Sequence, residues 1–304
     1  MAIGTDWMTA LPVTRTVARW VADRPWDPPP DLGVTVRGAL GKAVLDIACV
    51  RDDRQCPICD DRDRCVVPTW YDPARVGSHA ARPFALRVDA TPPAGTLQAV
   101  ITWFGVVPRP SLVVQALVRA GRAGLGAERI RHRLDRLEVH GEEGPVWVIA
   151  DRQEAASWPA PASLADLVDA SEPDDAVVVD LASRLRLRRD RQPPEAAELI
   201  SAGIGRVRQL ARLAGAKIDR WWPEPGAVQG AWVDRRFEKA SRWSQRQGDR
   251  IDLSGWQGTL ALGAEAHAFT DLLVALEVLQ IGHGTSAGMG AIRLRRVRED
   301  AAAP

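Results

Sequence analysis

The chain has 304 residues, of which 46% are hydrophobic and 26% charged, and its formal net charge is +1. This is a globular composition, sufficient for one large domain or two ordinary ones. No apolar run approaches the roughly 18 residues of a membrane span, and the first residues do not pair a basic segment with an apolar one. We therefore expect a cytoplasmic protein that neither enters a membrane nor is secreted.

The near-zero net charge conceals a difference along the chain. Residues 181–250 contain 16 Lys and Arg but only 8 Asp and Glu, so this window carries +8 and the remainder −7. The total charge therefore does not exclude a nucleic-acid-binding protein.

The apolar pattern predicts four strands and two helices in the first half of the chain. The strands are expected at residues 11–20, 83–88, 97–106 and 130–139. The first helix has Val36, Leu40 and Val44 on one face and ends at the cysteines, and the second covers residues 111–120.

All four cysteines lie in one short segment with the spacing C-x6-C-x2-C-x5-C. They are Cys49, Cys56, Cys59 and Cys65. Two thiolates of a CxxC pair can bind one metal ion, and two more complete a tetrahedral site. We expect a structural zinc ion, because four cysteine ligands leave no position open for water, and we expect no catalytic metal. An iron–sulfur cluster and plain thiols are the alternatives.

The second half repeats the order of the first. Strands are predicted at residues 177–187, 231–243, 250–262 and 291–297, and helices at 193–214 and 269–279. Residues 151–175, rich in Ala, Pro and Ser, are predicted to be a linker with a short helix near 164–167. Each half has the order β-α-β-β-α-β of the ferredoxin-like motif.

The predicted fold class is therefore α+β, with two tandem ferredoxin-like domains and the four-cysteine knuckle inserted in the first. The domains are expected at residues 1–150 and 176–304. A near-repeat supports the duplication, because AGLGA at residues 123–127 recurs as AGMGA at residues 287–291. Each copy follows the second helix of its half and precedes a strand with alternating arginines.

The second copy belongs to a loop with four glycines in residues 282–290. Glycines permit close approach of a ligand, and exposed backbone N–H groups suit phosphate. Arginines alternate on the neighbouring strands, which predicts a track for a nucleic-acid backbone. They include Arg184, Arg186, Arg188, Arg293 and Arg295. A flexible connector and an ordinary solvated strand face are the alternatives.

Six segments, in order, resemble the CRISPR repeat-processing endoribonucleases (Cas six type) of the RAMP superfamily. They are RGALGKA at 37–43 leading to the cysteines, WFG at 103–105, GLG at 124–126, RWSQRQ at 242–247, GWQG at 255–258, and IGHGTSAGMG at 281–290. The resemblance implies two ferredoxin-like (RRM-like) domains and binding of CRISPR repeat RNA. It also implies metal-independent cleavage by the ribose 2′-hydroxyl, and guide RNA that is kept or passed to other effector subunits.

Relatives often carry a histidine in the first helix, where this chain has Lys42, and no histidine precedes His79. We therefore take His283 of the glycine loop as the acid–base candidate, with Lys42 and Arg37 as further catalytic candidates. The resemblance and the charge pattern give a set of RNA-binding candidates. They are Arg186, Arg188, Arg242, Arg246, Gly282, Gly284, Thr285, Ser286, Gly288, Gly290 and Arg293.

Two other functions compete with a repeat-specific endoribonuclease. A RAMP subunit that holds or caps guide RNA without cutting it would also explain the absent histidine. A zinc-knuckle interaction protein without RNA would show no salt-dependent affinity for RNA.

Overall fold

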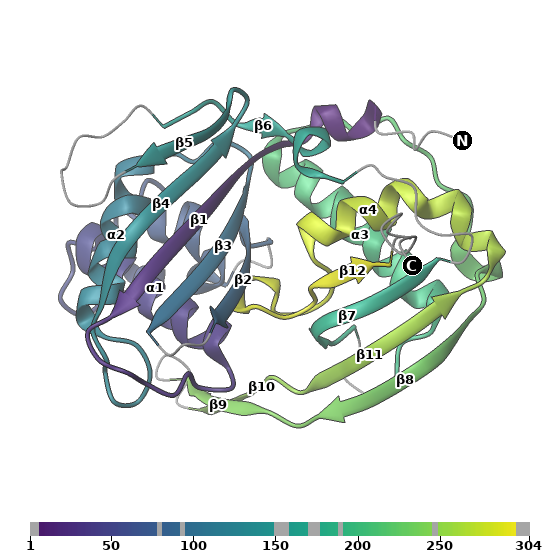
Figure 1. The fold of residues 1–304 in the computed structure, drawn as a ribbon. Coiled ribbons are helices and arrows are strands. Elements are labelled where there is room, and N and C mark those ends of the chain that lie inside the picture. The colour runs from purple at the N-terminus through teal and green to yellow at the C-terminus, as the bar shows by residue number, and fades with distance from the viewer. Residues whose placement is uncertain are drawn as a thin grey trace, which may run out of the picture.

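The computed structural model describes residues 6–77, 81–91, 95–148, 158–169, 177–187, 191–244 and 249–295. These residues form two halves side by side, each an antiparallel sheet packed with two long helices (Figure 1). None of the described helices combines the length and the apolar character needed to cross a bilayer.

The N-terminal half has the sheet order β2-β3-β1-β4-β5, and β6 also pairs with β1. Its elements are β1 (Pro12–Ala22), α1 (Leu32–Ala48), β2 (Phe84–Thr91), β3 (Thr96–Phe104), α2 (Pro110–Ala123), β4 (His132–Gly141), β5 (Gly144–Val148) and β6 (Ala162–Ser163). Because strand side chains alternate between faces, Ala18 and Trp20 of β1 enter the core shared with both helices. The Trp20 indole N–H donates to the Leu117 carbonyl of α2 at 3.2 Å.

The C-terminal half has the sheet order β12-β7-β11-β8. Its elements are β7 (Val178–Leu185), α3 (Ala196–Ala214), β8 (Gly230–Glu238), β9 (Ser241–Ser244), β10 (Asp249–Asp252), β11 (Gly255–Leu262), α4 (Thr270–Leu279) and β12 (Ile292–Leu294). The helix α3 ends at Gly215, whose φ of 66° fits the left-handed C-cap that glycine favours.

The four main strands of each half have the same order. In the N-terminal half the order is β2-β3-β1-β4, and the matching strands of the C-terminal half are β8-β11-β7-β12. Both orders are those of the predicted ferredoxin-like motif. AGLGA and its counterpart AGMGA also lie between the second helix and the fourth strand of their halves. Both glycines of each copy, Gly124 and Gly126 and then Gly288 and Gly290, have positive φ.

Two predicted strands are each divided into two. Residues 231–243 form β8 and then β9, and residues 250–262 form β10 and then β11, with β9 and β10 paired in a separate ribbon. The division falls where Leu253 is buried against Val34 and Met289, away from the main core. There the Ser254 hydroxyl accepts a hydrogen bond from the Ala240 N–H at 3.1 Å, in place of a ladder contact.

The predicted linker is partly ordered against the N-terminal half. Ala162–Ser163 pairs with the start of β1, and a short 3-10 helix follows at Leu164–Leu167, as predicted. The Ser163 hydroxyl and the Asp166 carboxylate close a capping box there. Residues 151–157 and 170–175 of this linker lie outside the described residues, and the domain boundaries stay predictions.

Buried polar contacts tie the first residues of the chain to the C-terminal half. Asp271 of α4 is 4% exposed and accepts hydrogen bonds from the indole N–H groups of Trp7 at 2.8 Å and Trp222 at 3.2 Å. Arg220 pairs with the same carboxylate at 3.0 Å. A second buried contact joins the two halves. The Gln280 side chain, just after α4, donates to the Leu86 carbonyl of β2 at 3.1 Å.

The start of α1 and the glycine loop meet backbone to backbone. A Cβ placed on Gly33 would lie 2.7 Å from the Ala287 carbonyl oxygen and 3.0 Å from the Gly288 Cα. A backbone oxygen cannot rotate away as a side chain can, so this contact requires glycine at position 33.

We predict opposite effects for two helical glycine substitutions. Gly33→Ala should lower the free energy of unfolding by about 1–3 kcal/mol, because the added methyl separates α1 from the loop. Gly205→Ala on α3 is the matched control, since its Cβ would meet nothing within 4 Å. It should raise stability by about 0.5–1 kcal/mol. Urea unfolding of both variants measures the difference, and a neutral Gly33→Ala would contradict this packing.

Candidate nucleic-acid interface

The predicted RNA-binding loop lies where the two halves meet. Thr285 and Ser286 are buried, whereas His283 is exposed and its backbone N–H donates to the Arg186 carbonyl at 2.9 Å. Gly282 and Gly284 flank His283, both with φ of 82°. The loop therefore has a buried part that anchors it and an outer part, residues 282–284, that is open to a ligand.

A buried arginine holds the anchored part of the loop. Arg206 of α3 donates to the Leu279 carbonyl and to the Thr285 hydroxyl, both at 3.2 Å. Its guanidinium lies over the Phe104 ring of β3, 5.2 Å from the ring centroid. Burial lowers the pKa of Arg206 to about 10, so the side chain remains a cation at neutral pH. This single cation thus joins α3, the loop and the N-terminal sheet.

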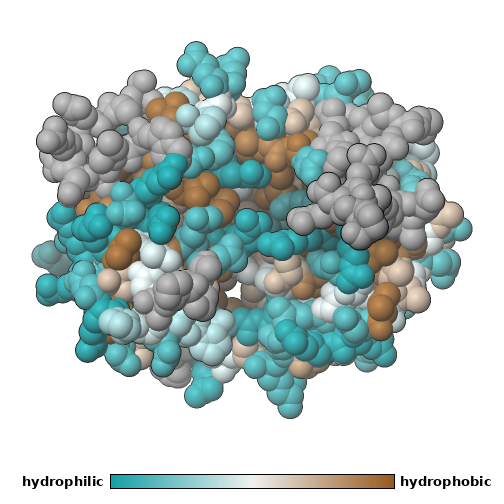
Figure 2. Space-filling model, viewed as in Figure 1, coloured by the Kyte–Doolittle hydropathy of each residue, from teal (hydrophilic) through white to brown (hydrophobic). Residues whose placement is uncertain are grey.

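Two other predicted RNA contacts meet at α1. The Arg242 side chain of β9 reaches α1, with its Nη1 atom 3.7 Å from the position of a Cβ on Gly38. Arg37 adjoins Gly38 and Lys42 follows it one turn later, so three predicted site residues lie on or against α1. Hydrophilic residues also cross the middle of the molecule on the face seen in Figure 2.

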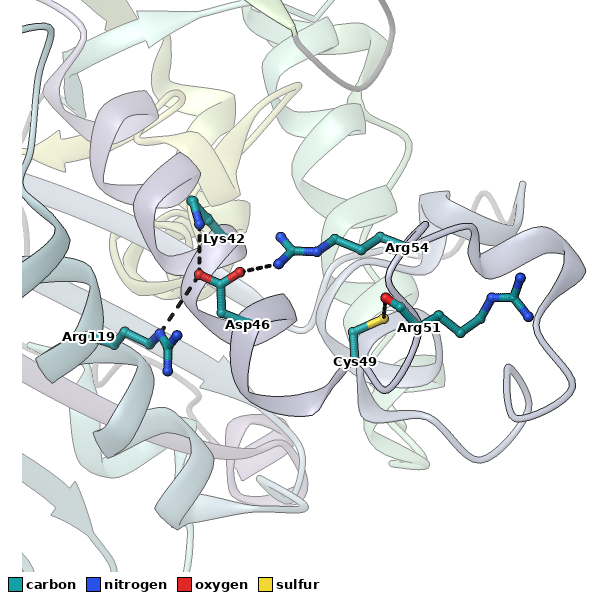
Figure 3. Close-up of polar contacts among 6 residues, drawn as sticks. All are labelled: Lys42, Asp46, Cys49, Arg51, Arg54 and Arg119. Atoms are coloured by element: carbon teal, nitrogen blue, oxygen red, sulfur yellow. Dashed lines mark hydrogen bonds and ion pairs between the residues drawn. The ribbon is translucent and has the colours of Figure 1, made fainter.

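Lys42 is a half-exposed cation within an ion-pair cluster. Its Nζ atom lies 2.8 Å from the Asp46 carboxylate, which also pairs with Arg54 at 2.6 Å and Arg119 at 3.8 Å (Figure 3). Partial burial opposes ionisation of Asp46, but the hydrogen bonds from Lys42 and Arg54 outweigh it and lower the pKa of this carboxyl. Three cations thus share one anion on the solvent side of α1.

Arg37 belongs to a second cluster, centred on Asp72, whose carboxylate is nearly buried. Arg82 contacts the Asp72 carboxylate at 3.0 Å, Arg37 at 3.7 Å and Arg75 at 3.8 Å. Burial lowers the pKa of Arg37, and the neighbouring Arg82 charge lowers it further. We refer to Arg37, Arg75, Arg82, Asp72 and Tyr71 as the Asp72 cluster.

The arginines predicted on the C-terminal strands have different surroundings. Arg184 of β7 pairs with Asp31 at the start of α1, and Arg186 pairs with Asp252 of β10 at 3.2 Å. Arg293 of β12 is exposed, and Arg295 pairs with Asp180 at 2.9 Å. Arg188, Arg246 and His79 lie outside the described residues.

The four cysteines are free thiols that line one cavity of about 230 Å³. Five arginines line it as well, namely Arg51, Arg54, Arg62, Arg64 and Arg109. The Cys49 thiol donates to the Arg51 carbonyl at 3.6 Å (Figure 3), and burial raises the pKa of Cys56. Within the described ranges, no group of three or more His, Cys, Asp or Glu side chains is arranged to hold a metal ion. The zinc knuckle therefore stays a prediction.

Two family models match different parts of this chain. Residues 11–160 match the AF_1859_N model, an N-terminal domain, and residues 179–292 match the CRISPR-associated endoribonuclease Cas6. Residues 179–292 are thus a Cas6-family domain. No curated protein matches it by sequence.

Solved Cas6 structures have the same fold as this chain. A Thermus thermophilus Cas6 in a product complex has 14% identity and a TM-score of 0.54, covering 93% of this chain and 99% of its own. A second Cas6 product complex has 15% identity and a TM-score of 0.51, with the same coverage.

Sequence reasoning missed most of the cations and both carboxylates around α1. Asp46 was visible only as one helix residue, and Asp72, Arg75 and Arg82 lie in the irregular segment between the cysteines and β2. No spacing rule connects that segment with Arg37, because the contact exists only after the segment folds back onto α1. Tyr71, the single tyrosine of the chain, was the one available signal.

We predict that Asp72→Asn destabilises the protein strongly. The change leaves three partly buried guanidiniums without their shared counter-ion, which should lower the free energy of unfolding by about 3 kcal/mol. The control is Asp135→Asn, which breaks the exposed pair with Arg133 and should cost less than about 0.5 kcal/mol. Equal denaturation midpoints for the two variants would show that Asp72 does not stabilise the fold as the shared counter-ion of these arginines.

Proposed function

We propose that this protein is an endoribonuclease that binds CRISPR repeat RNA and cleaves precursor CRISPR RNA into guide RNA. The match of residues 179–292 to the Cas6 family carries this proposal. The convergence of the glycine loop, β9 and α1 supports it, because this junction presents cations from both halves to one ligand. The product would stay bound or pass to other effector subunits in the cytoplasm.

The proposed chemistry needs no divalent metal. The ribose 2′-hydroxyl attacks the adjacent phosphate, the bond to the 5′-oxygen breaks, and a cyclic phosphate and a 5′-hydroxyl result. A base must take the 2′-proton, a cation must stabilise the charged phosphorane, and an acid must protonate the leaving oxygen.

The surroundings of each side chain suggest how these tasks are divided. Lys42 is ion-paired and half exposed, so it suits charge stabilisation and lacks the desolvation that would make a lysine a base. His283 is exposed at the outer part of the loop, and imidazole titrates near neutral pH, so it suits proton transfer. Arg37 supplies a guanidinium for phosphate.

RNA binding is assigned to the surface around these groups. Arg242, Arg186 and Arg293 are proposed to contact phosphates, with Gly282 and Gly284 allowing close approach of the backbone. The buried Thr285 and Ser286, with Gly288 and Gly290, act by fixing the shape of the loop. Arg188 and Arg246 remain proposed contacts from the sequence alone.

The test is single-turnover cleavage of repeat RNA in a brief assay with EDTA. Removal of a general acid or base typically costs 10²–10⁴-fold, so His283→Ala should slow cleavage at least about 100-fold, and Lys42→Ala should also slow it. The control is His267→Ala, in the 3-10 helix Ala264–Phe269 that precedes α4. This variant should keep the parental rate.

Two outcomes would contradict this proposal. Binding without cleavage by the parent protein would make it a non-cleaving RAMP subunit. Parental rates, within a few-fold, in both the His283 and Lys42 variants would remove these residues from the reaction.

We also propose that Cys49, Cys56, Cys59 and Cys65 hold a structural zinc ion. All four thiols line one cavity, and zinc binding would draw them together from its walls. Four thiolates around Zn²⁺ carry a net charge of −2, which the lining arginines would offset. The ion would order a polar segment that has few apolar side chains of its own.

We predict about one zinc per chain by elemental analysis, with tetrahedral thiolate absorption after cobalt substitution. Cys56→Ser with Cys59→Ser should abolish binding and lower the melting temperature, whereas Asp60→Asn in the same segment should change neither. Iron with visible cluster absorption, or metal-free protein of unchanged stability, would contradict zinc.

A further inference from the structure

We propose that Arg37, Arg75, Arg82 and the Tyr71 hydroxyl form a binding site for a phosphate group of the RNA. The ligand rests on the proposed function, whereas the anion site rests on the geometry of the Asp72 cluster. Arg75, Arg82 and Tyr71 thereby gain a role that neither the motifs nor the family match assigns.

The cluster has more positive than negative charge. Three guanidiniums contact the carboxylate of Asp72, with nearest distances of 3.0, 3.7 and 3.8 Å. The Asp72 side chain is 9% exposed, and those of Arg37 and Arg75 are 15% and 18% exposed. Asp72 supplies one negative charge, and Arg75 also hydrogen bonds with Cys56, a proposed zinc ligand. The remaining positive charge of the cluster has little water to screen it. A second anion would complete the balance.

Tyr71 supplies a hydrogen-bond donor with nothing to bind. Its side chain is buried, and its hydroxyl has no hydrogen-bond partner among the described residues. The ring is fixed between Gly41 of α1, 3.6 Å from the position of its Cβ, and Phe84, whose centroid is 5.2 Å away. Burial raises the pKa of Tyr71 to about 12, so the proton stays on the hydroxyl at neutral pH. Buried polar groups are normally paired, and a phosphate oxygen is the acceptor this donor lacks.

The cluster around Asp46 differs from the Asp72 cluster in the exposure of its cations. It also has three cations to one carboxylate, but the side chains of Lys42 and Arg119 are each 55% exposed, so water screens them. It also has no buried, unpaired donor in the described structure. Of these two clusters, only the one at Asp72 combines an excess of positive charge with a buried, unpaired hydroxyl.

The Asp72 cluster lies beside the junction of α1, β9 and the glycine loop. One RNA strand is therefore proposed to contact both. Arg37 adjoins Gly38, over which the Arg242 side chain of β9 lies, and Gly41 and Lys42 follow one turn later on α1. A strand held by Arg242 and Lys42 would therefore pass beside Arg37. Arg82, the most exposed of the three arginines at 32%, stands at the solvent side of the cluster.

Arg82→Gln tests the site with little risk to the fold, because Asp72 keeps Arg37 and Arg75 as partners. The matched control is Arg133→Gln, which breaks one exposed pair at 3.0 Å. Tyr71→Phe removes the donor and keeps the ring. Each protein is titrated with repeat RNA over a range of salt concentrations, and separately with inorganic pyrophosphate in a thermal-shift assay.

We expect Arg82→Gln to bind RNA about tenfold more weakly than Arg133→Gln, with a log–log salt slope shallower by about 0.7 for one lost single-strand phosphate contact. Tyr71→Phe should also bind more weakly, with an unchanged slope. Pyrophosphate should stabilise the parent and Arg133→Gln more than Arg82→Gln.

If Arg82→Gln matches Arg133→Gln in affinity, slope and thermal shift, the site is overturned. If the parent binds no RNA, the proposed function fails, and RNA is rejected as the ligand of this site. A pyrophosphate effect lost in Arg82→Gln would then still establish the anion site itself.

Discussion

The close approach of two backbones, at Gly33 and at Ala287–Gly288, is the constraint on which the rest of this molecule depends. It sets the first turn of α1 directly on the glycine loop, with no side chain between them. Val34, Leu253 and Met289 then pack beside it and bring in the β9–β10 ribbon. From the other side, Arg206 joins the loop to Phe104 of the N-terminal sheet. Elements from both halves thus share one small junction, and the cations of α1 lie beside it.

Electrostatics explains how a chain with a net charge of +1 can offer a strongly basic surface. Asp46 and Asp72 each hold three cations around one carboxylate, so both sides of α1 carry an excess of positive charge. The two carboxylates fix the geometry of these side chains without neutralising them. The acidic residues that balance the total lie elsewhere. The cysteine segment, residues 49–65, holds five aspartates beside four arginines, and arginines also line its cavity.

Periodicity and turn residues predicted the two long helices and the four main strands of each half, because most of these elements bury one regular face. They did not predict β5 and β6 of the N-terminal sheet. They could not predict where Leu253 leaves the ladder, since its burial depends on Val34 and Met289 from distant parts of the chain. The candidate site was predictable to the extent that it follows motifs, as for Lys42, Arg242 and His283. Arg75, Arg82 and Asp72 were not, because an irregular segment has no period and its charges acquire meaning only beside Arg37. Burial of Thr285 and Ser286 was likewise invisible, since a glycine-rich loop has the same sequence whether it is exposed or anchored.

The junction between Gly33 and the glycine loop also orders events during synthesis. Domains fold as units as the chain emerges, so the N-terminal sheet and its two helices can form early. Its α1 nevertheless lacks the loop, the buried Arg206 contact and the β9 arginine until nearly the whole C-terminal half has left the ribosome. A chain interrupted before that point would carry the cations of α1 with no opposing surface to hold a strand against them. If the proposed function holds, the surface shared by α1, β9 and the glycine loop is therefore completed only after both halves have folded.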